Sequence, residues 1–202
     1  MRGKIILLYR QSWLLALLLF AGCSSGESAP GASSPGQVPA EFADLEFSSP
    51  PVVHHDDGGR VQVEVSSAWQ DDGPLIVRAT FSPDDSGFHL YDSQLPKAGV
   101  MGIGRPTLIE VSDAEKYASI GPMIADKTPL ANFDETLKVE VPIYPDGPVT
   151  LYLPIQYQTM PDGPTKLAVQ LTYMSCSKNR CNVPVERAVA ELTVPALRAA
   201  TK

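Results

Sequence analysis

PDGPVTLYLPIQYQTMPDGP, the stretch from Pro145 to Pro164, contains the pattern that decides the fold. Its centre, residues 149–157, is a mostly apolar run, rich in β-branched, aromatic and aliphatic side chains, with the length of one strand. The same tetrapeptide, Pro-Asp-Gly-Pro, closes each end of the run, and tight turns select these residue types. The stretch therefore predicts a strand between two turns, and we expect it to lie in a meander of antiparallel strands.

Strand patterns of the same kind continue in both directions from this stretch. Residues 61–69 alternate valine with polar side chains, which is the period of a half-buried strand. Pro142 and Pro154 fall inside strand candidates, and because proline cannot donate to a ladder we expect an edge or a bulge at each. Many short strands with little helical periodicity predict an all-β sandwich. The other strand candidates are 75–81, 88–92, 107–112, 138–143, 166–176 and 188–194.

The amino terminus has the features of an export signal. Arg2, Lys4 and Arg10 form a basic start, and the apolar run that follows is too short for a stable membrane span. Two small residues directly before Cys23 resemble the lipobox of bacterial lipoproteins. This resemblance implies a signal peptide over residues 1–22, cleavage before Cys23 and lipid on the new amino terminus. The alternative is an ordinary signal peptide cut nearby, with Cys23 incidental.

The residues from Cys23 onward predict a tether followed by one folded domain. Residues 23–41 are rich in Ser, Gly, Pro and Ala and have little apolar surface to bury, so we expect a disordered linker. The domain then spans 42–197, and 198–202 form a tail. Ser, rather than Asp, follows the cysteine. The lipoprotein interpretation therefore places the protein in a bacterial cell envelope, on the outer membrane facing the periplasm if the cell is Gram-negative.

The charge of the chain excludes some classes of partner. The formal net charge is −7, from 16 Lys and Arg against 23 Asp and Glu, and no basic stripe is visible. This balance argues against nucleic acid as a partner. It also argues against docking on anionic lipid through charge, so we expect contact with the membrane to depend on the lipid at the amino terminus.

Two cysteines stand close together near the end of the chain, in YMSCSKNRCNVPVE. Cys176 and Cys181 have four residues between them, and in an oxidising compartment we expect them to form a disulfide. Lys178 and Arg180 lie between them, where a positive charge favours the thiolate that exchanges disulfides. Pro184 stiffens the exit of the loop. The residues alone leave two interpretations open: a pair that exchanges, or a structural clip whose basic residues are only solvated.

Two stretches resemble the amino-terminal periplasmic domain of the thiol:disulfide interchange reductase DsbD. LTYMSCSKNRCNVPVERAVAELTV resembles the end of that domain, where an aromatic strand, here with Tyr173, enters a cysteine, a short polar loop, a second cysteine and a nearby proline. We expect Tyr173 to support the loop, and its place in an alternating strand also allows a core position. GFHLYDSQLPKAGVMGIGRPTLIEV resembles an upstream segment with a Gly-rich turn and a Pro-Thr pair. The two stretches bracket most of the domain, from residue 61 to residue 194.

The resemblance implies an immunoglobulin-like sandwich and a functional role for the cysteine pair. It implies that Cys176 and Cys181 cycle between dithiol and disulfide. We expect no metal or other cofactor. Electrons would come from a thioredoxin-like or membrane donor and pass to oxidised exported client proteins. Of the two sulfurs, we expect Cys181 to join the partner and Cys176 to resolve the mixed disulfide.

The chain also departs from the family. A cap loop with acidic residues and an aromatic side chain shields the family's cysteines, and the corresponding MIADKTPLANFDE offers Asp126 and Phe133 at a different spacing. The full-length reductase also has a multi-span membrane domain and a thioredoxin-like domain. Neither is found in this sequence, so we expect separate proteins to supply the electrons.

A second hypothesis is a lipoprotein module without enzymatic activity, which has a permanent disulfide and binds a partner, or which binds Cu(I) through the two cysteines in reduced form. Met160 and Met174 would add soft ligands to the cysteines for copper. The histidines are weaker candidates. We interpret His54 and His55 as part of a polar loop, and His89 as a structural residue of a strand.

Overall fold

The computed structural model describes residues 37–71, 73–135 and 138–197. The predicted signal peptide (1–22), the predicted lipid site at Cys23 and the tail (198–202) lie outside the described residues, as does the linker up to residue 36. Within the described part, the helical elements are the 3₁₀ turns η1 (Ala40–Phe42) and η2 (Ala114–Lys116). No helix there has the length and apolar character needed to cross a bilayer.

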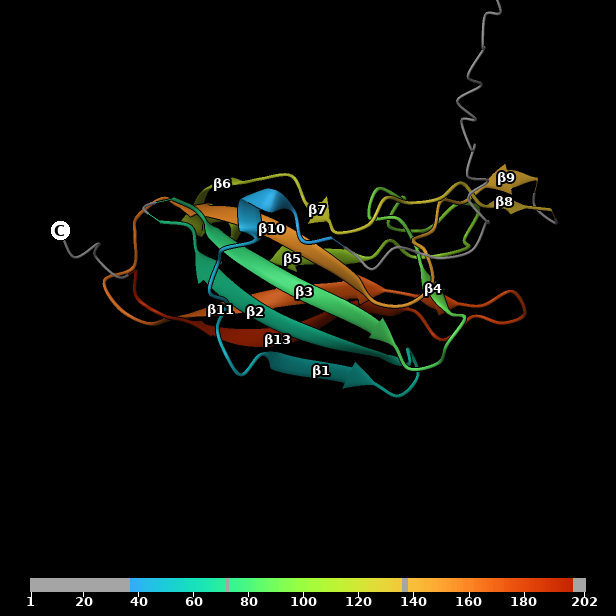
Figure 1. Cartoon of the computed structure of the whole chain (residues 1–202), viewed down its shortest axis with the longest axis horizontal. Coiled ribbons are helices and arrows are strands. Elements are labelled where there is room, and N and C mark those ends of the chain that lie inside the picture. Colours follow the sequence, from blue (N-terminus) through green and yellow to red (C-terminus); the bar gives the residue numbers. More distant parts are fainter. Residues whose placement is uncertain (1–36, 72, 136–137, 198–202) are drawn as a thin grey trace, which may run out of the picture. The chain divides into compact units, whose positions relative to one another are not determined.

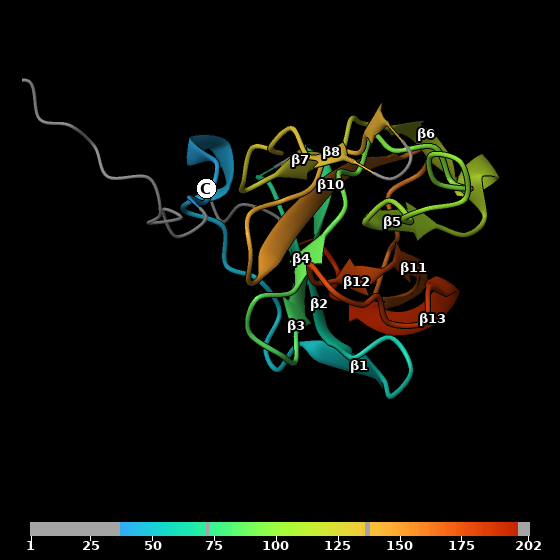
Figure 2. The ribbon, with the colours of Figure 1, turned by 90° about the vertical axis from the view of Figure 1, so that its right-hand side faces the viewer.

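The strands form two main antiparallel sheets that face each other across one core (Figures 1 and 2). Valine, leucine and isoleucine side chains from both sheets meet in a single buried cluster. Burying the apolar faces of both sheets against each other is the arrangement that the alternating patterns require. The predicted all-β, immunoglobulin-like sandwich is therefore confirmed.

The bounds of the strands follow, sheet by sheet. The larger sheet has the order β1 (Val52–Asp56), β2 (Val61–Trp69), β3 (Leu75–Pro83), β10 (Val149–Tyr157) and β6 (Tyr117–Ile120), with β7 (Ile124–Ala125) also on β10. The smaller sheet has the order β13 (Val185–Val194), β11 (Thr165–Tyr173) and β5 (Leu108–Val111). Two short ladders pair β12 (Ser175–Cys176) with β4 (His89–Leu90), and β8 (Phe133–Asp134) with β9 (Val139–Glu140).

The expected meander around β10 is wrong. β10 pairs with β3, β6 and β7 in the larger sheet, whereas β11 pairs with β13 and β5 in the smaller one. The second Pro-Asp-Gly-Pro turn therefore carries the chain from one sheet to the other. A turn sequence fixes where the chain reverses. The strand that becomes the lateral neighbour depends on how the apolar faces pack, which the turn does not specify.

The two prolines also lie differently from the expectation of edges or bulges. Pro142 lies just after β9, outside a strand. Pro154 lies inside β10, opposite Ile76 of β3, in the interval between the partners β7 and β6. Its carbonyl accepts a hydrogen bond of 2.8 Å from the amide of Gly121. On the edge of β10 that pairs with β7 and β6, Pro154 falls between the two partners, so no hydrogen bond from its backbone nitrogen is needed there. An interior strand therefore tolerates the proline.

The polar loop expected at His54 and His55 is instead strand β1. This strand pairs with β2 from Val52↔Val65 to Asp56↔Val61. It lies at the edge of the sheet, and its burial alternates: Val53 and His55 are exposed, whereas Val52, His54 and Asp56 are half-buried. The sequence hid this strand because polar and apolar residues do not alternate along it.

The segment before β1 covers the outer face of the larger sheet. Phe42 is 3% exposed and its ring stacks on Tyr152 with the centroids 4.9 Å apart. The guanidinium of Arg78 lies 4.0 Å from the ring centroid of Phe47. The backbone amide of Gln37 also donates to the carbonyl of Asp126. Described contacts thus begin inside the stretch expected to be linker.

The two short ladders extend the sandwich at one end. Figure 2 looks onto this end and shows β4 beside β12, with β8 above them. The ladder of β4 and β12 places Cys176 opposite His89 and Ser175 opposite Leu90. The cysteine segment therefore leaves the smaller sheet and is held by a strand that follows β3 of the larger one.

Candidate functional site

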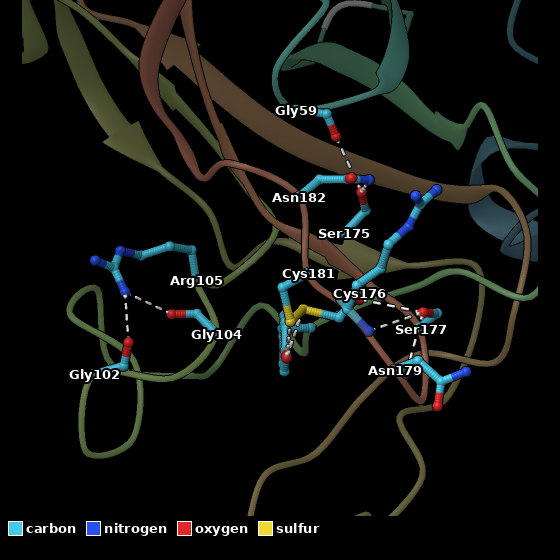
Figure 3. The surroundings of a disulfide bond; sticks show 12 residues. Gly59, Gly102, Gly104, Arg105, Ser175, Cys176, Ser177, Asn179, Cys181 and Asn182 are labelled. Carbon is cyan, nitrogen blue, oxygen red and sulfur yellow. Dashed lines mark hydrogen bonds between the residues drawn. A yellow bond between two sulfur atoms is a disulfide. The ribbon is translucent and has the colours of Figure 1, made fainter.

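Cys176 and Cys181 form a disulfide, as the sequence predicts, with an S–S distance of 2.00 Å. Cys176 ends β12, and the chain returns through a tight loop to an antiparallel bridge between the two cysteines. Ser177 holds the loop: its amide donates to the carbonyl of Arg180 at 2.8 Å, and its hydroxyl accepts from the amide of Asn179 at 3.3 Å. Figure 3 shows the disulfide, with the contact between Ser177 and Asn179 to its right.

The two sulfurs have unequal environments. Cys176 is buried, with 1% of its surface exposed, and belongs to a small apolar cluster with Tyr91, Leu95 and Val141. Cys181 is exposed. Because a thiolate must reach a sulfur to attack it, access favours Cys181 as the sulfur that meets a partner.

Tyr91 is the polar group that contacts the sulfurs. Its hydroxyl donates a hydrogen bond of 3.0 Å to Sγ of Cys176 and lies 4.0 Å from Sγ of Cys181. Burial raises the pKa of the Tyr91 phenol, and the carboxylate of Asp134 raises it further. The phenol therefore remains protonated at neutral pH and keeps its capacity to donate.

The Gly-rich stretch positions Tyr91. Gly104 has φ +74°, and a Cβ there would lie 2.9 Å from two carbons of the Tyr91 ring. Residues 99–104 form a sharp turn, as the glycines predict, and Gly104 of this turn packs against the ring of Tyr91. Arg105 fixes this turn, because its guanidinium donates to the carbonyls of Gly102 and Gly104, as Figure 3 shows, and pairs with Glu186 at 2.6 Å.

The two basic loop residues differ in their surroundings. Lys178 is exposed at the tip of the loop. The guanidinium of Arg180 pairs with Asp85 at 3.1 Å and lies 5.2 Å from the ring centroid of Phe88. Asp85 also pairs with Arg60 at 3.2 Å. The charge of Arg180 is thus shared with a carboxylate. A supporting role of Lys178 and Arg180 for the thiolate stays a prediction.

The exit of the loop docks on the turn between β1 and β2. The amide group of Asn182 donates to the hydroxyl of Ser175 at 2.9 Å, and that hydroxyl donates to the carbonyl of Gly59 at 3.0 Å (Figure 3). The amide of Val183 donates to the carbonyl of Gly58 at 3.1 Å. Pro184 then leads directly into β13, and its role in stiffening the exit stays a prediction.

Tyr173, which the sequence placed in support of the loop, lies in the main core. It is fully buried, and its ring packs edge-on against Phe81 with the centroids 5.7 Å apart. Tyr91 occupies the position beside the sulfur instead. The signal for Tyr91 was present in GFHLYDS, one of the two stretches that carry the family resemblance, but nothing local in that strand pattern points to a cysteine 85 residues away.

The expected cap residues lie in two different places. Asp126 follows β7, where its carboxylate accepts a hydrogen bond of 2.9 Å from the amide of Thr150 on β10. Phe133 begins β8 and is 53% exposed. The carboxylate of its neighbour Asp134 helps to raise the pKa of the Tyr91 phenol. Val139 of the paired strand β9 packs against the apolar cluster around Cys176. A cap role for Asp126 and Phe133 stays a prediction.

The methionines proposed as copper ligands do not both lie near the cysteines, contrary to the second hypothesis. Met174 packs against the cluster of Cys176, but Met160 lies beyond the opposite end of β11, which at about 3.3 Å per residue separates it from the sulfurs by roughly 30 Å. His55 pairs with Asp84 at 3.1 Å on the surface. Among the described residues, no three His, Cys, Asp or Glu side chains form a cluster suited to a metal ion.

His89 remains a strand residue beside the site. It pairs with Cys176 across the ladder of β4 and β12, and its ring packs edge-on against Tyr91 with the centroids 5.6 Å apart. Burial lowers the pKa of the His89 imidazole, and the charge of Asp146 partly opposes this effect. The ring is therefore neutral at neutral pH, which suits packing in an apolar setting.

Two solved structures are similar to this chain. One is the reduced amino-terminal domain of DsbD from Neisseria meningitidis, with 19% identity over 70% of this chain and 90% of that chain, and a TM-score of 0.41. The other is the amino-terminal periplasmic domain of ScsB from Proteus mirabilis, with 16% identity over 72% of this chain and 50% of that chain, and a TM-score of 0.43. No protein-family model and no curated protein sequence matches the chain. The first structure is of the domain that the two sequence stretches resemble.

Proposed function

We propose that this protein is an exported thiol–disulfide exchange domain, which passes electrons from a thioredoxin-like or membrane donor to oxidised client proteins. The observation that carries the proposal is the unequal environment of one disulfide. Cys181 is open to solvent, while Cys176 is buried and accepts a hydrogen bond from Tyr91. This arrangement gives one sulfur that a partner can attack and one that can leave as a stabilised thiolate.

The reduction of the domain begins with a thiolate of the reduced donor. It attacks Sγ of Cys181, the Cys176–Cys181 bond breaks, and the electron pair of that bond goes to Cys176. The donor's second thiolate then attacks its own sulfur in the mixed disulfide and releases Cys181. The donor is now a disulfide, and the domain has gained two electrons and, once both thiolates are protonated, two protons.

The transfer to a client reverses these roles. The thiolate of Cys181 attacks a client disulfide, and one client sulfur leaves as a thiolate. Cys176 then attacks Sγ of Cys181, which restores the internal disulfide and releases the second client thiolate. The proposal thus assigns contact with partners to Cys181 and resolution to Cys176.

Tyr91 supports this reaction through the thiolate of Cys176. Burial disfavours a charged sulfur, and a hydrogen bond from a neutral phenol offsets part of that penalty. Such a donor would add little to a permanent clip. A bridge across so short a loop contributes only about 2 kcal/mol by the chain-entropy formula, so stabilisation is a weak reason to keep it.

We also propose lipid attachment at Cys23 and a location in the bacterial cell envelope, on the outer membrane facing the periplasm in a Gram-negative cell. The support is the export signal and the small residues before Cys23. The mass of the mature amino terminus tests this part separately. A lipid-modified cysteine at the first position is expected, and an unmodified terminus would contradict it.

Trapping tests the exchange reaction. In cells that export the full chain, the Cys176→Ala variant leaves Cys181 without its resolving partner, and we expect mixed disulfides with exported proteins. The matched Cys181→Ala variant leaves the buried sulfur and is expected to trap far less. A redox titration gives the second readout. A pair that stays oxidised far below about −300 mV is a structural bridge, and the proposal then fails.

A further inference from the structure

A single carboxylate joins the loop between the cysteines to two other segments of the domain. One Oδ of Asp85, in the connection between β3 and β4, pairs with Arg180 at 3.1 Å. The other pairs at 3.2 Å with Arg60, in the turn between β1 and β2. Phe88, from the same connection as Asp85, lies under the Arg180 guanidinium at 5.2 Å. Two oxygens of one side chain thus serve two cations from different segments.

We propose that Asp85 is a positioning residue of the exchange reaction, which holds Arg180 and so sets how much positive charge acts on Cys181. This inference rests on the proposed function. Arg180 is the residue directly before Cys181, so its ion pair with Asp85 forms at the residue next to the reactive cysteine in the chain. A cation beside a cysteine stabilises the thiolate, and a carboxylate that pairs with the cation weakens this effect.

The other charges near the loop have different partners. Lys178 is exposed at the loop tip. Asp84, adjacent to Asp85, pairs with His55 at 3.1 Å instead of with an arginine. Asp134 acts on the phenol of Tyr91. Because Asp84 and Asp85 are neighbours in one connection and carry the same charge, Asp84 provides a control for the general loss of a negative charge.

The test measures the pKa of the Cys181 thiol in the full chain carrying Cys23→Ser and Cys176→Ala, where Cys181 is the remaining cysteine. The readout is the pH dependence of its alkylation by iodoacetamide. With Asp85→Asn, we expect this pKa to fall by about half a unit, because exposed ion pairs are weak. At neutral pH this is about a threefold rise in the thiolate fraction. Asp84→Asn is expected to shift it much less.

A double-mutant cycle separates positioning from a general field effect. If Asp85 acts through Arg180, the effect of Asp85→Asn should largely disappear in an Arg180→Gln background, and Asp85→Glu should restore the parent value. Equal shifts for Asp84→Asn and Asp85→Asn, or an undiminished shift in the Arg180→Gln background, would overturn the inference. Circular dichroism of each variant checks the fold.

The same variants with both redox cysteines present distinguish this inference from the proposed function. The readout is the reduction potential against glutathione, and the expected change for Asp85→Asn is toward a less negative value, since a more stable thiolate favours the reduced form. A parent protein that cannot be reduced in this buffer contradicts the proposed function. A parent that is reduced, with Asp85→Asn and Asp84→Asn at equal potentials, contradicts only the role of Asp85.

Discussion

The hydroxyl of Tyr91 donates a hydrogen bond of 3.0 Å to Sγ of Cys176, a residue that lies 85 positions further along the chain. The contact joins the residue that directly follows β4 to the last residue of β12, which is one end of the disulfide. It places a neutral donor beside the sulfur that, in the proposed reaction, leaves as a thiolate when a partner attacks Cys181.

Removing this donor tests its effect on the thiol. In the Cys23→Ser, Cys181→Ala protein, Tyr91→Phe keeps the ring and loses the hydroxyl. We expect the pKa of the Cys176 thiol to rise by about one unit, because hydrogen bonds to charged groups contribute about 1.5–3 kcal/mol. The ultraviolet absorbance of the thiolate, followed over pH, gives the value.

Tyr157→Phe is the control for this substitution, because its ring lies against Tyr117 and Trp69, away from the disulfide. It should leave the pKa of Cys176 unchanged. If Tyr91→Phe also leaves that pKa unchanged, the hydrogen bond does not stabilise the thiolate.

Two glycines of one loop separate backbone strain from contact with Tyr91. Gly102 and Gly104 both have positive φ, but a Cβ at Gly102 meets nothing within 4 Å, whereas one at Gly104 lies 2.9 Å from the Tyr91 ring. We expect Gly102→Ala to cost about 1–2 kcal/mol of unfolding free energy and Gly104→Ala about 2–4 kcal/mol. Urea denaturation measures both. Equal costs would show that the ring moves aside freely.

The carboxylate of Asp126 makes stability depend on pH. Burial raises the pKa of this group in the folded protein, although its hydrogen bond from the Thr150 amide opposes the rise. The folded state therefore holds the proton more tightly than the unfolded state, and stability falls as pH rises through the folded pKa. We expect Asp126→Asn to be more stable than the parent at neutral pH and similar to it in acid.

Urea denaturation at both pH values measures this difference. Asp162→Asn, in an exposed turn, is the control and should change the unfolding free energy little at either pH. A parent and an Asp126→Asn variant with parallel pH profiles would show that Asp126 is not linked to stability in this way.

Two phenylalanines test which parts of the chain hold the sandwich together. Phe42 is 3% exposed and stacks on Tyr152, whereas Phe133 is 53% exposed. We expect Phe42→Ala to cost about 3 kcal/mol of unfolding free energy and Phe133→Ala less than about 0.5 kcal/mol. A small cost for Phe42→Ala would mean that the segment before β1 is not part of the cooperative core.

Much of this molecule follows from local patterns. Alternation of apolar and polar side chains and the Pro, Asp and Gly turns sufficed to predict strands at 61–69, 75–81 and 149–157, because strand and turn preferences act over a few residues. The export signal and the two cysteines that remain beside Cys23 also sufficed to predict the disulfide, since an even number of cysteines pairs in an oxidising compartment.

Other features needed the tertiary structure. The sequence predicted β10 and β11 as neighbours, but they lie in different sheets, because the packing of apolar faces chooses a strand's partner. It placed Tyr173 near the loop, but Tyr91 reaches the sulfur, since the ladder of β4 and β12 brings those distant segments together. The sequence predicted that the positive charge of Arg180 favours the thiolate, but it could not show that the fold pairs Arg180 with Asp85. Sequence thus determined the strands by short-range preferences and the disulfide by the number of cysteines, while long-range packing decided which side chains surround that disulfide.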